Sequence, residues 1–131
     1  QRHGLPRNIM IAWDGSAGAS RAVRGALPLL QRSGTVVITI VRPASEDAAS
    51  PSDPSCALIL AYLAHQGVAA AVNTVTTKES VGNVLLGAAR SENADLMVMG
   101  CYGHSPLKET LFGGATRDVL ANPALPLFLS C

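Results

Sequence analysis

The sequence predicts an α/β domain in which helices cover both faces of an open, five-stranded parallel sheet. Short runs rich in aliphatic and β-branched residues alternate along the chain with segments whose apolar residues recur at helical spacing. Its 131 residues suit one domain, and a hydrophobic content of 48% is enough for a sizeable core. Strands that alternate with helices pair in parallel through right-handed crossovers. We therefore expect a single domain over residues 1–131.

The N-terminal third of the chain begins this alternation. Residues 9–13 are continuously apolar, which is typical of a buried strand. Residues 16–33 repeat their apolar positions every three to four residues and predict a helix. Pro28 cannot donate a backbone hydrogen bond, so we expect the helix to kink or to end early there. Gly34 then stops it, and the β-branched residues of 35–41 form the second strand.

The middle of the chain continues the same pattern. Residues 42–52, rich in Ser, Ala and charged side chains, are expected to form a loop. A helix follows over 53–66, with Asp at its cap and Pro at its first position. Residues 68–76 form a less apolar strand that we place near a sheet edge. A helix over 80–93 and a buried strand over 95–99 complete this part.

The last part of the chain holds a loop with glycines at both of its ends, over residues 100–113. A final helix is expected over 115–121, and a fifth strand runs from Leu125 to Leu129. Ligands of open parallel sheets bind beyond the carboxyl ends of strands, at the point where the strand order reverses. If the first and fourth strands are neighbours, the order is 3-2-1-4-5 and this point lies between them.

Both of those strand ends are followed by residues suited to a ligand. Asp14 follows the first strand in an Asp-Gly-Ser sequence, and the glycine loop follows the fourth. Glycines let the backbone approach an anion closely, and the N–H groups at a helix N-terminus favour negative charge. The loop glycines are Gly100, Gly103, Gly113 and Gly114. They predict a phosphate site, although tight turns alone would also use glycines.

Composition argues against several other classes of protein. The formal net charge is +1, the Lys and Arg residues are spread out, and aromatic residues make up 4%, so no nucleic-acid surface is expected. No apolar run approaches the ~20 residues of a membrane span. Cys56, Cys101 and Cys131 form no metal signature and favour a reduced, cytoplasmic protein. The chain begins with Gln1, so we expect a trimmed chain or one half of a longer protein.

Several polar residues have simpler interpretations beside a functional one. Asp14 is equally suited to a turn before the helix, and Ser16 is expected to be the helix cap. His104 lies within the glycine loop, where it could approach a phosphate or stay solvated. Cys101 in the same loop could take a redox role. No catalytic triad and no pair of carboxylates is evident, so we expect no enzyme activity.

The chain resembles the universal stress protein family over essentially its whole length. The resemblance rests on residues 9–16, on residues 95–100, and on the glycine loop. The family's nucleotide motif is Gly-x2-Gly-x9-Gly followed by Ser or Thr. This chain keeps Gly100, Gly103 and Gly113 but has Gly114 in place of the hydroxyl residue. The missing hydroxyl predicts weak ATP binding. A Gly-Gly sequence at this position resembles that in the halves of tandem-type members.

The resemblance implies a Rossmann-like fold, akin to the adenine nucleotide alpha hydrolases, and a site for ATP, with ADP or AMP as alternatives. Asp14 would contact the adenine or ribose, Val41 would line the adenine pocket, and backbone N–H groups of the loop would hold the phosphates. The residues that would contact the nucleotide are Ala12, Trp13, Asp14, Val41, Met99, Gly100, Gly103, His104, Gly113, Gly114, Ala115 and Thr116.

Three functional hypotheses remain open at this stage. The first is a cytoplasmic stress-response module that binds ATP. The second is a dimerisation or interaction module of the same fold that has lost nucleotide binding. The third is a slow ATPase that uses His104 or Asp14. The family usually dimerises through its last strand, here Leu125 to Leu129, so a homodimer or a tandem partner domain is expected.

Overall fold

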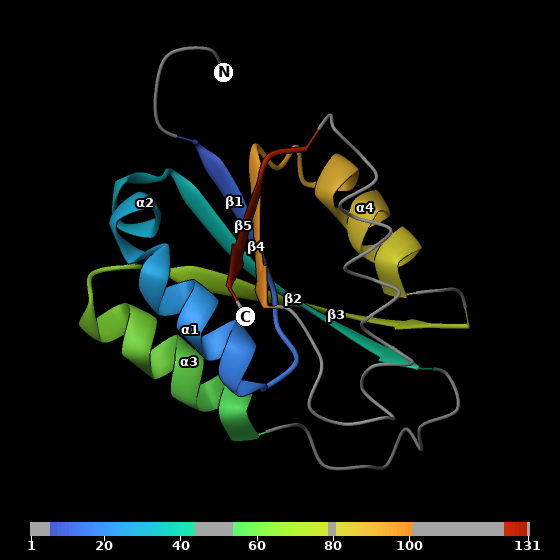
Figure 1. The fold of residues 1–131 in the computed structure, drawn as a ribbon, viewed down its shortest axis with the longest axis horizontal. Coiled ribbons are helices and arrows are strands. Elements are labelled where there is room, and N and C mark those ends of the chain that lie inside the picture. The colour runs from blue at the N-terminus through green and yellow to red at the C-terminus, as the bar shows by residue number, and fades with distance from the viewer. Residues whose placement is uncertain (1–5, 44–53, 79–80, 101–124, 131) are drawn as a thin grey trace.

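The sheet has the strand order β3-β2-β1-β4-β5, and all four neighbouring pairs are parallel. This computed structural model describes residues 6–43, 54–78, 81–100 and 125–130 (Figure 1). The strands are β1 (Asn8–Ala12), β2 (Thr35–Pro43), β3 (Ala70–Thr77), β4 (Leu96–Gly100) and β5 (Leu127–Ser130). The predicted order 3-2-1-4-5 is therefore confirmed.

Helices lie on both faces of this sheet, as predicted (Figure 1). They are α1 (Ala17–Gly25), α2 (Leu27–Arg32), α3 (Pro54–His65) and α4 (Val81–Ser91). Alternate residues of β1 face opposite ways. Ile9 and Ile11 pack with α1 and α3 in one buried cluster, whereas Met10 packs with α4 in another. The two clusters place α1 and α3 on one face and α4 on the other.

The helix expected over residues 16–33 is divided at Ala26 into α1 and α2. Pro28 lies in the first turn of α2, where a missing N–H costs nothing because first-turn N–H groups have no partner within the helix. Proline therefore ends one helix and begins the next, which is the early end that the sequence predicted. Gly67 ends α3 with a φ of +82°, a conformation that glycine adopts readily.

β3 is an edge strand, as its polar sequence indicated. Most of its side chains are exposed or half-buried, and Val72 is 41% exposed. β1 and β4, by contrast, are central and almost wholly buried. The register of β1 on β4 pairs Ile11 with Val98, so the carboxyl ends of these two strands lie side by side. Helices α1 and α4 lie on opposite faces of the sheet.

The opposite, amino edge of the sheet is held by Asp95. Its Oδ2 atom accepts hydrogen bonds from the backbone N–H groups of Asn8 at 3.0 Å and Arg7 at 2.9 Å. The bond from Asn8 lowers the pKa of Asp95 below its ordinary value, burial opposes this, and the bond from Arg7 adds to it. The carboxylate thus ties the beginning of β4 to the beginning of β1.

Replacing Asp95 with asparagine should lower stability at neutral pH and flatten its acid dependence. A carboxylate whose pKa is depressed in the folded state stabilises the protein above its unfolded-state pKa, and this contribution is lost as the pH falls through the folded-state value. Urea unfolding of both proteins across the acid range measures the effect. Parallel pH profiles for the wild type and Asp95→Asn would contradict this role.

Candidate functional site

The two predicted strand ends meet at the carboxyl edge of the sheet, where β1 and β4 are neighbours. Gly100, the last residue of β4, lies against the first turn of α1. A Cβ atom at Gly100 would fall 2.4 Å from the carbonyl carbon of Gly18 and 2.5 Å from the backbone nitrogen of Ala19. Only glycine permits this approach. It draws the end of β4 against the helix that begins just after Asp14.

Asp14 is half-buried and uses only one of its two carboxylate oxygens within the described structure. Oδ1 accepts a hydrogen bond of 2.9 Å from the backbone N–H of Ser16, and this turn passes through Gly15 with a φ of +78°. Oδ2 is buried and has no hydrogen-bond partner among the described residues. The turn therefore fixes the carboxylate and leaves one buried acceptor for a ligand donor, since such atoms are rarely left unsatisfied.

Ser16 caps α1, as predicted. Its Oγ atom accepts a hydrogen bond of 3.1 Å from the backbone N–H of Ala19. The first turn of α1 contains no acidic residue, so within that turn no side chain offsets the positive end of the helix dipole. The turn at Asp14 and the cap at Ser16 are thus confirmed, and the role of Asp14 in ligand binding stays a prediction.

Three apolar residues predicted to contact the nucleotide gather on the face covered by α4. Ala12, Val41 and Met99 belong to one buried cluster, together with Leu85 of α4. Val41 is 8% exposed and Met99 is 1% exposed. These side chains form a firm apolar layer directly beneath the carboxyl edge on that face.

The side chain of Trp13 lies on the other face, apart from those three. It packs in the cluster of α1 and α3, and its Nε1–H donates a hydrogen bond of 3.1 Å to Ser55 Oγ. Its backbone N–H donates to the carbonyl oxygen of Thr39 at 3.0 Å, which extends the β1–β2 pairing. Trp13 can therefore meet a ligand at the carboxyl edge with its backbone, while its ring faces the groove between α1 and α3.

The remaining predicted contacts lie outside the described residues. They are Gly103, His104, Gly113, Gly114, Ala115 and Thr116. Cys101, the redox candidate, also falls in that stretch. Across residues 6–43, 54–78, 81–100 and 125–130, no group of three or more His, Cys, Asp or Glu side chains could hold a metal ion. None of the helices in those ranges has the length and apolar character of a membrane span.

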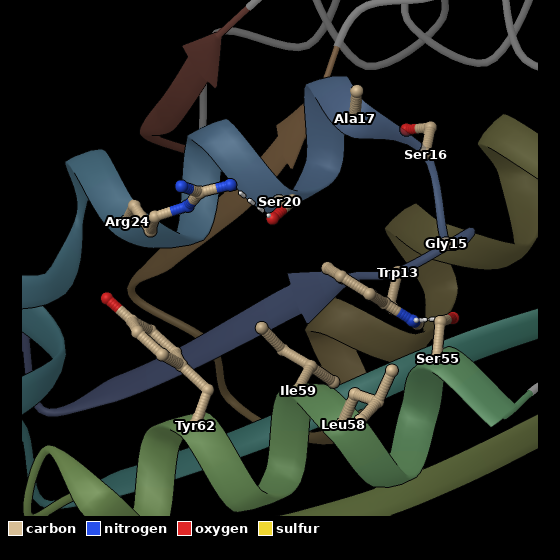
Figure 2. Close-up of a pocket in the computed structure, with 10 residues that line it drawn as sticks. All are labelled: Trp13, Gly15, Ser16, Ala17, Ser20, Arg24, Ser55, Leu58, Ile59 and Tyr62. Atoms are coloured by element: carbon tan, nitrogen blue, oxygen red, sulfur yellow. Dashed lines mark hydrogen bonds between the residues drawn. The ribbon is translucent and has the colours of Figure 1, made fainter.

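A pocket that the sequence analysis missed lies between α1 and α3 (Figure 2). Its volume is about 570 Å³. The lining residues are Trp13, Gly15, Ser16, Ala17, Ser20, Arg24, Ser55, Leu58, Ile59 and Tyr62. Two aromatic residues line it, although the chain is only 4% aromatic. That concentration becomes visible only when α3 is packed beside α1.

Glu92, in the turn just after α4, is a second carboxylate with an oxygen that lacks a partner in the described part of the chain. Its Oε2 accepts hydrogen bonds from Asn73 Nδ2 at 3.3 Å and Thr39 Oγ1 at 3.4 Å, and its buried Oε1 has no partner among the described residues. Burial raises the pKa of Glu92 above its ordinary value, against weaker opposition from the bonds of Asn73 and Thr39. The two bonds join the turn after α4 to β2 and β3.

Glu92→Gln is expected to raise stability at neutral pH. A carboxyl group whose pKa is raised in the folded state favours folding while it is protonated, and that contribution is lost as the pH rises through the folded-state value. Glutamine keeps an oxygen for Asn73 and Thr39 but carries no charge. Urea unfolding at acidic and neutral pH tests this: the gain should shrink in acid, and a loss of stability at neutral pH would contradict it.

Comparisons with known proteins agree with this architecture. Residues 6–129 match the model of the Universal stress protein family. No curated protein matches the chain.

A solved structure from that family in Burkholderia pseudomallei is 26% identical, with a TM-score of 0.65 over 93% of each chain. A universal stress protein in complex with cAMP is 20% identical, with a TM-score of 0.69 over 98% of each chain. One from Archaeoglobus fulgidus in complex with dAMP is 14% identical, with a TM-score of 0.65 over 95% of this chain and 97% of the other.

Proposed function

Because the chain belongs to the universal stress protein family, we propose that it is a cytoplasmic stress-response module that binds an adenine nucleotide at the carboxyl edge of β1 and β4. One observation supports this most directly. Asp14 Oδ2 is buried at the point where the strand order reverses, and no residue in the described part of the chain forms a hydrogen bond with it. Ligands of open parallel sheets bind at that point. A nucleoside offers the donors that this oxygen lacks, in the ribose hydroxyls and the adenine amino group.

The described residues fit each part of a nucleoside. Asp14 Oδ2 would accept a hydrogen bond from the ribose or the base. Ala12, Val41 and Met99 supply an apolar layer next to this edge for the flat adenine ring. Gly100 draws the end of β4 against the first turn of α1, the helix that begins just after Asp14. The phosphates would extend toward the glycine loop that the sequence predicts.

We favour ATP among the adenine nucleotides, bound without hydrolysis. Two structural neighbours hold cAMP and dAMP, which supports an adenine ligand in this fold. The preference for a triphosphate rests on the glycine-rich sequence after Gly100. Gly114 lacks the hydroxyl of the family motif, and a missing neutral hydrogen bond costs on the order of 1 kcal/mol. ATP should therefore bind several-fold more weakly than it would with serine at this position.

Calorimetric titration with ATP, ADP and AMP tests the proposal on protein freed of carried-over nucleotide. Saturable binding of ATP, with the diphosphate and monophosphate progressively weaker, is the expected result. Equal affinities for the three would retain the nucleoside site and refute the phosphate loop. No heat with any of them, from protein that carried none at purification, would refute nucleotide binding altogether.

A specific observation favours a second function, self-association through β5. This strand forms one edge of the described sheet, and its apolar side chains are only half-buried. The carbonyl of Pro126 accepts a hydrogen bond from Met97, so the backbone groups of the next residue, Leu127, and of Leu129 face away from β4. An exposed apolar edge is a template for pairing, and a second copy of β5 would satisfy both strands by two-fold symmetry.

The dimer should be visible by sedimentation velocity at micromolar concentration. Leu129→Pro removes an N–H that faces the open edge while leaving the bonds to β4 in place, so it should shift the protein to monomer. Its thermal unfolding, compared with that of the wild type, shows whether the domain stays folded. A wild-type protein that sediments as a monomer at all concentrations would contradict this proposal.

A further inference from the structure

The pocket between α1 and α3 has the size and lining of a small-molecule site. Its volume of about 570 Å³ lies within the range of known ligand pockets. In Figure 2 the side chains of Leu58, Ile59 and Tyr62 rise from α3 toward α1, and Trp13 closes the space between the helices. Ile59 is buried, whereas Leu58 is 71% exposed at the mouth. An apolar ligand body would cover Leu58 and rest on Ile59 and the indole.

A positively charged side chain, that of Arg24, lies at one end of the pocket. The exposed guanidinium of Arg24 donates a hydrogen bond of 3.1 Å to Ser20 Oγ, and both residues line the pocket. Among the described residues, none of the carboxylates forms an ion pair with Arg24. A guanidinium has five N–H donors in a planar fork that matches a carboxylate. Most of these donors remain available to a ligand.

The other end of the pocket is rigid. Trp13 is 6% exposed and its ring is held by the hydrogen bond to Ser55 Oγ. Ser55 belongs to α3 and Trp13 follows β1, so this bond fixes one wall relative to the other. A preformed wall lowers the entropy that a ligand must lose to bind.

This pocket adjoins the proposed nucleotide site at Trp13, Gly15 and Ser16, and the rest of it lies apart from that site. Its side chains come from the face of α1 and α3, whereas Ala12, Val41 and Met99 lie in the cluster on the face of α4. Asp14, whose free oxygen supports nucleotide binding, is not among the lining residues. The pocket runs along the two helices from Ser16 as far as Arg24 and Tyr62, away from the end of β4.

We propose that the groove between α1 and α3 is a second binding site, for a small carboxylate with an apolar, aromatic body. The body would lie on Trp13, Ile59 and Leu58, and the carboxylate would pair with Arg24. Apolar contacts alone would bind any hydrophobic molecule of suitable size. The guanidinium of Arg24 makes the pocket selective for an anion. This inference does not depend on nucleotide binding, because Arg24, Leu58 and Ile59 line the pocket and are not among the residues expected to contact the nucleotide.

The test uses phenylbutyrate and its uncharged amide, which have the same apolar body. Trp13 is the one tryptophan in the chain and lines the pocket, so its fluorescence and its indole N–H resonance both report on a ligand bound there. Phenylbutyrate should shift the indole resonance and change the fluorescence in a saturable way. The amide should bind about tenfold more weakly, because it cannot form a charge-assisted bond with the guanidinium.

Two arginine variants locate the carboxylate. Arg24→Gln should weaken phenylbutyrate binding about tenfold and leave the amide unaffected, whereas the matched variant Arg32→Gln at the end of α2, outside the lining, should change neither. Saturating ATP should leave the phenylbutyrate affinity unchanged. The proposal is overturned if the indole resonance does not respond to phenylbutyrate. Equal binding of acid and amide, an unaffected Arg24→Gln, or displacement by ATP would also overturn it.

Discussion

Gly100→Ala is expected to lower the free energy of unfolding by about 3 kcal/mol, at the upper end of the usual cost of overpacking a tight contact. The new methyl group would fall 2.4 Å from the carbonyl carbon of Gly18 and 2.9 Å from its oxygen. Both atoms belong to the backbone of α1, so relief requires the whole first turn of the helix to move away from β4. Urea unfolding followed by circular dichroism measures the loss.

Gly87→Ala provides the matched control in the same measurement. Gly87 lies within α4, and a Cβ atom built there meets no atom of the described residues within 4 Å. Alanine favours a helix over glycine, so this variant should be more stable by about 0.5–1 kcal/mol. If both variants lose a similar amount of stability, the close contact of β4 with α1 is not the cause of the Gly100→Ala defect.

Asp14→Asn is expected to weaken ATP binding about thirtyfold, since a hydrogen bond to a charged acceptor is worth about 1.5–3 kcal/mol. Asparagine keeps one oxygen for the turn with Ser16 but places an amide NH2 group where Oδ2 stands without a partner. A ligand donor would then face another donor. Calorimetric titration with ATP gives the affinity of each protein.

Asp95→Asn is the control for this prediction, at the opposite edge of the sheet. It removes a carboxylate whose Oδ2 atom accepts hydrogen bonds from the backbone N–H groups of Arg7 and Asn8. The two variants should show contrasting effects: Asp14→Asn loses affinity with little loss of stability, and Asp95→Asn loses stability with little loss of affinity. An Asp14→Asn protein with wild-type affinity would remove Asp14 from the site.

Much of the fold could be predicted from local sequence because periodicity and turn chemistry agree along the chain. The buried strand around Ile11, the break at Pro28 and the stop at Gly67 each have one dominant local cause. The strand order followed from the right-handed crossovers that connect parallel strands and from the positions of Asp14 and Gly100 at the ends of the first and fourth strands. These features depend on residues close together in sequence or on general rules of α/β topology.

Other features could not be predicted because they depend on contacts between distant segments. Nothing local shows that the ring of Trp13 turns away from Val41 and bonds to Ser55, 42 residues further along the chain. The unsatisfied oxygens of Asp14 and Glu92 likewise exist only in the packed structure. The pocket between α1 and α3 also combines residues from two helices that are distant in sequence, and the sheet sets how far apart these helices lie.

The most direct test of the nucleotide site is to follow the assigned backbone amide resonances during a titration with ATP. The account predicts that the amides of Gly15, Ser16 and Gly100 shift together and saturate with one dissociation constant. The amides of Gly34 and Gly67, remote from the carboxyl edge, should stay in place. Shifts confined to other parts of the molecule, or none at saturating ATP, would contradict the placement of a nucleotide between β1 and β4.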